Sequence, residues 1–145
     1  MSVSTALRPA ATSPFPATTL LGLARHGLAE AASTGSPAER YAAAHLAALR
    51  VAAAVLACRA RPATPGARRS RPTSAWVLLT TVAPELGEWA AFFAAGANKR
   101  AAAEAGLRSS VTPREADDLL RDADAFLAVV EATLGLSSQL PLSAG

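Results

Sequence analysis

The stretch that most constrains the fold of this chain is Ser36–Cys58, SPAERYAAAHLAALRVAAAVLAC. Ser36 can cap a helix, and Pro37 suits the first helical position because its missing N–H would have no partner there. Glu39 follows at the spacing of a capping box. From position 41 to the end of the stretch, only one histidine and one arginine are strongly polar. A helix that is apolar nearly all the way round is buried, so the other helices must pack around this one.

Length and composition predict one all-α domain. A chain of 145 residues can bury enough core for one domain but has no room for a second. The sequence is rich in alanine, only 5% of it is aromatic, and it lacks a convincing run of alternating β-branched residues, which favours helix over strand. We therefore expect a four- to five-helix bundle.

The expected location is the cytoplasm. The chain has one cysteine, Cys58, which cannot form an intramolecular disulfide and which we expect to be a buried, inert thiol. The beginning, MSVSTALRPA, has no apolar segment after a charged start and so does not read as a secretory signal. The central stretch is interrupted by His45 and Arg50 and is mostly alanine, which makes it a poor membrane span.

Charge is distributed unevenly along the chain. Residues 1–73 hold nine arginines and two acidic residues, whereas residues 74–145 hold five cations and nine acids. The densest basic segment is Arg59–Thr73, RARPATPGARRSRPT, whose prolines and glycine exclude a regular helix and predict an exposed loop. Its arginines are candidate contacts for RNA phosphates, namely Arg59, Arg61, Arg68, Arg69 and Arg71. The alternative is a solvated linker with no ligand.

Capping residues and apolar periodicity place the remaining elements. We expect a disordered tail over residues 1–17, a helical domain over residues 18–135 and a frayed tail over residues 136–145. The first helix should run from Thr18 or Thr19 to about Ala32, with an apolar stripe. Its buried stripe consists of Leu21, Ala24, Leu28 and Ala31.

The second half of the chain shows further helix signals. Ser74 can cap a short helix, AWVLLTTVA, which Pro84 interrupts before the segment ELGEWAAFFAAGANKRAAAEAG continues. The aromatic residues of that segment are expected to lie in the core, and Gly96 to mark a bend or a close helix contact. The last helix should begin with a capping box of Thr112 and Glu115 and end near Gly135.

The acidic cluster near the start of the last helix is a weak candidate for a metal site. Asp118 and Asp122 share a helix face, but no histidine or second carboxylate motif accompanies them. Arg121 can pair with Asp117 at the i,i+4 spacing, so a solvated charged face is the better interpretation. The sequence also holds no glycine-rich phosphate loop, HExxH motif or nucleophile elbow. We therefore expect no metal and no cofactor.

Arg40 and His45, in the segment RYAAAH, form the remaining candidate for chemistry. An imidazole can take the proton of a ribose 2′-hydroxyl, and a guanidinium can stabilise the charge that develops on the neighbouring phosphate. This attack requires no metal ion. Five residues turn through about 140° on an ideal helix, so the two side chains do not share a face, and the arginine must reach around or a partner subunit must complete the site. The alternative is a core histidine, because His45 lies four residues from both Tyr41 and Leu49.

Three segments carry a resemblance to a known family. They are PAERYAAAHLAALRVAAAVLA, SAWVLLTTVAPELGEWAAFFAAGANKRAAAEAG and TPREADDLLRDADAFLAVVE, within residues 19–134. Together they resemble a small actinobacterial family of the HEPN superfamily. The resemblance implies a homodimeric all-α domain, and in many superfamily members a metal-independent RNase in which the Arg and His of an R-x4-H motif face each other across the dimer cleft. In this chain the residues of that motif are Arg40 and His45. The partners that the resemblance implies are RNA, a protein partner or an antitoxin.

The sequence departs from the RNase pattern at two positions. RNase members often have a polar residue directly after the arginine, where this chain has Tyr41, and antitoxin-paired toxins have a tyrosine two residues after the histidine, where it has Ala47. Three function hypotheses follow. The first is an RNA-binding, metal-independent endoribonuclease that uses Arg40 and His45. The second is a non-catalytic helical module for protein interaction, in which His45 and Tyr41 belong to the core and the basic loop binds an acidic partner or nothing. The third and weakest is nucleotide binding without turnover.

Overall fold

A computed structural model describes residues 16–59, 74–107 and 110–135 of the chain, and these residues form helices and turns without a strand. The helices are α1 (Ala17–Ala32), α2 (Pro37–Arg59), α3 (Ala75–Val82), α4 (Gly87–Ala95), α5 (Ala97–Glu104) and α6 (Pro113–Leu134), with a 3-10 turn at Pro84–Leu86 between α3 and α4. The predicted all-α bundle is confirmed. Most of the predicted N-terminal tail, all of the predicted C-terminal tail and the basic loop beyond Arg59 lie outside the described residues.

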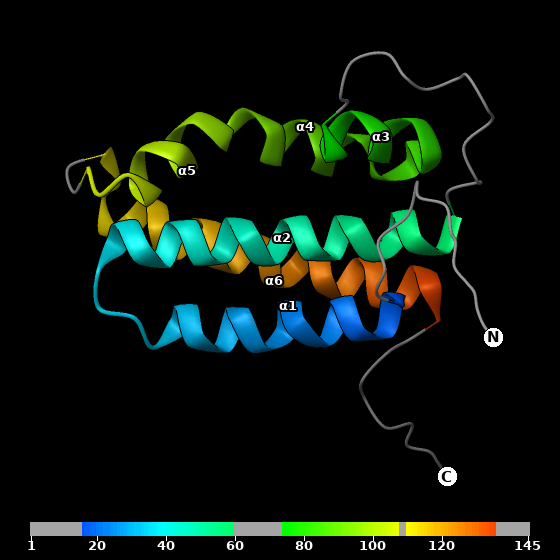
Figure 1. Cartoon of the computed structure of the whole chain (residues 1–145), viewed down its shortest axis with the longest axis horizontal. Coiled ribbons are helices and arrows are strands. Elements are labelled where there is room, and N and C mark those ends of the chain that lie inside the picture. Colours follow the sequence, from blue (N-terminus) through cyan, green and yellow to red (C-terminus); the bar gives the residue numbers. More distant parts are fainter. Residues whose placement is uncertain (1–15, 60–73, 108–109, 136–145) are drawn as a thin grey trace, which may run out of the picture.

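Helix α2 lies at the centre of the bundle (Figure 1). It packs against α1 and α6 on one side and against α3 and α5 on the other. By length and composition alone α2 could cross a membrane, but half of its most apolar window is buried inside the bundle. It is therefore the core helix that the sequence predicted.

The helix ends follow the local capping chemistry of the sequence. The Ser36 hydroxyl accepts the Glu39 N–H at 3.3 Å, and the Ser74 hydroxyl accepts the Val77 N–H at 3.2 Å. At the start of α6 both bonds of a capping box form between Thr112 and Glu115. The carboxylate of Glu115 has a lowered pKa, because the Thr112 backbone N–H and the Lys99 ammonium stabilise its charge. Gly135 ends α6 with φ +71°, in the left-handed region that glycine adopts without strain.

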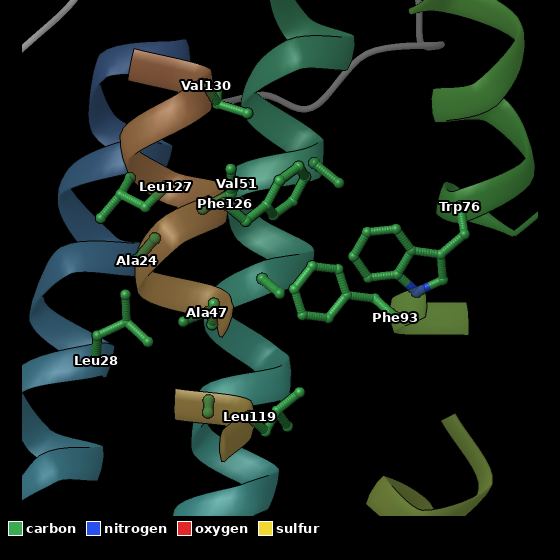
Figure 2. Close-up of a cluster of buried hydrophobic side chains, with 14 of the residues drawn as sticks. Ala24, Leu28, Ala47, Val51, Trp76, Phe93, Leu119, Phe126, Leu127 and Val130 are labelled. Carbon is green, nitrogen blue, oxygen red and sulfur yellow. The ribbon is translucent and has the colours of Figure 1, made fainter. Parts of the chain in front are cut away.

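Alanine and aliphatic residues fill the space between α1, α2 and α6, and aromatic rings fill the space toward α3 and α4 (Figure 2). The Phe93 ring lies 5.1 Å from that of Phe126 and is stacked on Trp76 at 5.3 Å, measured between ring centroids. The predicted stripe of α1 is buried throughout. The aromatic stripe of α4 is core as predicted at Phe93, while Phe92 remains 47% exposed.

Two side-chain predictions were wrong. Cys58, in the last turn of α2, is exposed and not buried. Arg121 pairs with Asp118, with 2.9 Å between guanidinium nitrogen and carboxylate oxygen, and not with Asp117. Asp117 instead forms an ion pair with Arg40 of α2.

Candidate functional site

His45 lies inside the bundle, on the side of α2 that faces α4. Only 1% of its surface is exposed. The rings of Trp76 and Phe93 meet the imidazole edge-on, with centroids 6.0 and 6.2 Å away. The structure therefore shows the core histidine that the sequence analysis gave as the alternative, with Trp76 and Phe93 as its aromatic contacts.

The imidazole is held by one hydrogen bond to backbone. Its Nε2 lies 2.8 Å from the carbonyl oxygen of Phe93, and since a carbonyl only accepts, Nε2 carries the proton and donates it. The Nδ1 atom is buried and has no hydrogen-bond partner among the described residues. Burial lowers the pKa of His45, and the Arg100 charge lowers it further, against opposing contributions from the Phe93 hydrogen bond and Glu104. The ring is therefore neutral near pH 7.

The break between α4 and α5 leaves the Phe93 carbonyl able to accept the hydrogen bond from His45. Helix α4 ends at Ala95 and α5 begins at Ala97, with Gly96 between them. The Phe93 carbonyl accepts the Gly96 N–H at 3.0 Å and has a second lone pair for the imidazole. A Cβ on Gly96 would lie 2.7 Å from the hydroxyl oxygen of Tyr41 and 3.8 Å from the ring of His45. Gly96 is therefore both the bend and the close contact that the sequence predicted.

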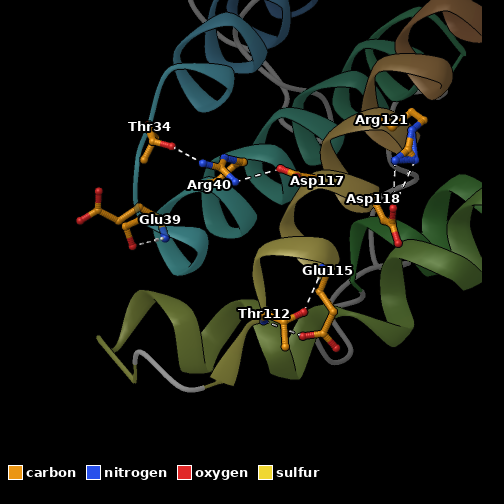
Figure 3. Close-up of polar contacts among 9 residues, drawn as sticks. Thr34, Glu39, Arg40, Thr112, Glu115, Asp117, Asp118 and Arg121 are labelled. Carbon is orange, nitrogen blue, oxygen red and sulfur yellow. Dashed lines mark hydrogen bonds and ion pairs between the residues drawn. The ribbon is translucent and has the colours of Figure 1, made fainter.

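Arg40 lies between Thr34 of the α1–α2 turn and Asp117 of α6 (Figure 3). Its guanidinium donates to the Thr34 carbonyl at 2.6 Å and to the Asp117 carboxylate at 2.9 Å. These bonds tie the turn between α1 and α2 to the first turns of α6. The side chain is 16% exposed, so its apolar stem is also packed.

The structure does not bring Arg40 and His45 together within one chain. The arginine points to the α1–α2 turn and to α6, whereas the imidazole points to the end of α4. This divergence follows from the helical spacing of five residues. A site that uses both residues would need the His45 ring to leave the Phe93 carbonyl and a phosphate to replace Asp117 at the guanidinium.

Most of the predicted RNA contacts lie outside the described part of the chain. Arg59, the last residue of α2, pairs with Glu85 at 2.6 Å. That contact is the main reason that the pKa of Glu85 is lowered. The other arginines lie outside the described residues, namely Arg61, Arg68, Arg69 and Arg71. Within the described ranges, no group of three or more His, Cys, Asp or Glu side chains is arranged to hold a metal ion.

Sequence reasoning missed a half-buried ion pair between α1 and α6. Arg25 meets Glu131 at 3.2 Å, and the carboxylate side chain is only 11% exposed. The signal available in the sequence was that Glu131 interrupts the apolar stripe of α6. Its partner Arg25 is too distant along the chain for spacing to reveal the pair. The pair links two core helices and lies away from both candidate catalytic residues.

Comparison with known proteins identifies one family. The model of the family described as HEPN_SAV_6107-like HEPN matches residues 31–131, from the end of α1 to near the end of α6. No curated protein and no solved structure matches the chain.

Proposed function

Because this chain belongs to the HEPN_SAV_6107-like HEPN family, we propose that it is a HEPN-like module that acts by binding another protein and has no RNase activity of its own. The family assignment agrees with the resemblance read from the three sequence segments. The observation that carries the proposal is the burial of His45, whose ring is 1% exposed and bonded to a backbone carbonyl.

A general base must reach the proton that it abstracts, directly or through one water. The one protonated nitrogen of His45 is already bonded to Phe93, and the other faces the interior. Arg40 likewise donates one N–H to the Thr34 carbonyl and one to the Asp117 carboxylate. Breaking the Phe93 contact to build a catalytic site would leave the buried Nε2–H of His45 unpaired, at a cost of about 1–3 kcal/mol.

Metal-independent endoribonuclease activity is the second candidate. The observation that favours it is the R-x4-H pair itself, since the lowered pKa keeps the imidazole in the neutral form that a general base requires. In this mechanism His45 takes the 2′-hydroxyl proton, Arg40 stabilises the phosphate in the dimer cleft and the arginines after α2 hold the RNA backbone. Homodimer formation and a cytoplasmic location belong to both candidates and stay predictions.

One experiment separates the two. The full chain is incubated with a mixed RNA in EDTA beside Arg40→Ala and His45→Gln, with Arg114→Ala as a surface control and circular dichroism to verify folding. We expect every protein to leave the RNA intact. Cleavage by the wild type and by the control, abolished in both folded site variants, would refute the proposal and establish the nuclease.

A further inference from the structure

A groove that neither candidate function uses runs between α4 and the first half of α6. It consists of two adjoining hollows, of about 330 and 270 Å³, which share Phe92 and Asp122. We call it the aromatic–acidic groove and define it by six residues, Tyr41, Glu88, Trp89, Phe92, Asp118 and Asp122. Together the hollows are in the size range of small ligand sites, roughly 300–1,000 Å³, so the groove can take more than one side chain.

Aromatic rings form one wall of the groove and are supported from behind. Trp89 is stacked on Phe126 of the core, with ring centroids 5.3 Å apart. Phe92 meets Phe93 edge-on at 5.0 Å and is itself 47% exposed. These contacts fix the aromatic side chains in place before any ligand arrives, which lowers the ordering cost of binding.

Carboxylates line the groove from both helices, Glu88 from α4 and Asp118 and Asp122 from α6. Asp118 is neutralised by Arg121 at 2.9 Å and by Arg114 at 3.7 Å. Within the described part of the chain, neither Glu88 nor Asp122 takes part in an ion pair with a cation, although both line the hollow that contains Trp89 and Phe92. The groove therefore combines the exposed ring of Phe92 and the half-buried ring of Trp89 with carboxylate charge that the described residues do not balance.

The one lysine of the groove region does not balance this charge. Lys99 lies in the second hollow and is engaged at the far end, where it meets the Glu115 carboxylate at 3.2 Å and donates to the Ser110 carbonyl at 3.1 Å. Glu88 and Asp122 are therefore the two charged residues that line the first hollow, and both are acidic. A polyanion such as RNA would be repelled there.

We propose that the aromatic–acidic groove binds an arginine-bearing peptide segment of a partner protein, with guanidinium groups held between the aromatic faces and the carboxylates of Glu88 and Asp122. A guanidinium is planar, stacks on aromatic rings and forms forked hydrogen bonds with carboxylates. The groove offers both kinds of partner side by side. This inference rests on the proposed interaction function and names the chemistry of the partner.

The test uses the full-length protein and a fluorescein-labelled octapeptide, GRLRGRLG, with binding measured by fluorescence anisotropy at low ionic strength. A matched peptide replaces every arginine by citrulline, which keeps the planar shape but removes the charge. We expect the citrulline peptide to bind at least about tenfold more weakly. Equal affinity for both peptides would overturn the proposal, because the groove would then select apolar contact and not cations.

Protein variants locate the binding. Phe92→Ala and the double variant Glu88→Gln with Asp122→Asn should each weaken arginine-peptide binding about tenfold. Glu30→Gln, an exposed carboxylate on α1, is the matched control and should leave it unchanged. Thermal unfolding verifies that the substitutions leave the fold intact. An equal loss in the control, or no loss in the groove variants, would refute the site.

A second copy of this chain is the rival occupant of the groove. Sedimentation of wild type and Phe92→Ala in the absence of peptide distinguishes it, and we expect the same oligomeric state for both. A dimer that dissociates on Phe92→Ala would overturn the proposal in favour of self-association. The peptide experiment and the RNA cleavage experiment test different residues. A failure of the peptide proposal is therefore distinguishable from a failure of the proposed function.

Discussion

The Nε2–H of His45 donates to the carbonyl oxygen of Phe93 at 2.8 Å, which joins the central helix α2 to the last turn of α4. The Phe93 carbonyl also accepts the Gly96 N–H, and the imidazole from 48 residues away along the chain takes its second lone pair. The same bond fixes the imidazole tautomer and removes its proton donor from any external substrate.

His45→Ala should lower the free energy of unfolding by about 2–4 kcal/mol, because it leaves a cavity beside Trp76 and removes the donor to the Phe93 carbonyl. His45→Gln can place an amide N–H near the same carbonyl and should cost less than half as much. Urea denaturation measures both. His26→Ala, on an exposed side chain of α1, should change stability by no more than about 0.5 kcal/mol. Equal effects of the two position-45 variants would mean that the hydrogen bond contributes nothing.

Stability should fall as the pH drops below about 6.5, the ordinary pKa of histidine. The folded protein lowers the pKa of His45, so the unfolded chain binds a proton at a higher pH than the folded one, and protonation favours unfolding. From pH 7.5 to pH 5.5 the loss from this residue is up to about 1.4 kcal/mol. Denaturation of wild type and His45→Gln at both pH values measures the contribution of His45 to this loss of stability, since Arg100 and Glu104 remain in both proteins. An identical pH dependence would contradict the lowered pKa.

Gly96→Ala should destabilise the protein by about 1–2 kcal/mol. Its Cβ would lie 2.7 Å from the Tyr41 hydroxyl oxygen, and the tyrosine ring is 7% exposed and cannot swing aside freely. The backbone at Gly96 has φ −88°, which alanine adopts without strain. The penalty therefore comes from the side-chain clash, and Tyr41→Phe should remove most of it. A double-mutant cycle with thermal unfolding tests this, and additive effects at the two positions would exclude the clash.

Arg40 and Asp117 should show a coupling of about 0.5–1 kcal/mol in a double-mutant cycle. The carboxylate is 59% exposed, which limits the energy, and high salt should reduce it further. Arg40→Lys should not replace the arginine fully, because one ammonium cannot span both Thr34 and Asp117 as the fork does. The measurement is urea denaturation at low and high salt. A coupling that salt leaves unchanged would contradict an electrostatic origin.

The parts of the fold that the sequence predicts well are those decided by neighbouring residues. The Thr112–Glu115 capping box and the left-handed Gly135 involve contacts within a single turn, and both bounds of α6 follow from them. The apolar stripe of α1 follows from the period of the helix in the same way.

The candidate site was only half predictable, because its partners come from distant segments. The period of α2 places His45 on a buried stripe, yet the carbonyl that binds it belongs to a helix end created by Gly96. Asp117 lies 77 residues from Arg40 along the chain, so the local i,i+4 rule assigned that aspartate to Arg121 instead. Spacing within one helix cannot reveal which side chain a separate helix will present.

The unequal lengths of the helices divide the molecule into two units that differ in how readily they open. Helices α1, α2 and α6 span 16, 23 and 22 residues, whereas α3, α4 and α5 span 8, 9 and 8. Short helices have few hydrogen bonds of their own and depend on packing, so amide hydrogens of α3–α5 should exchange before those of α2. The same local opening would expose His45 to solvent, which makes the chemical reactivity of one imidazole a reporter of the motion of three helices.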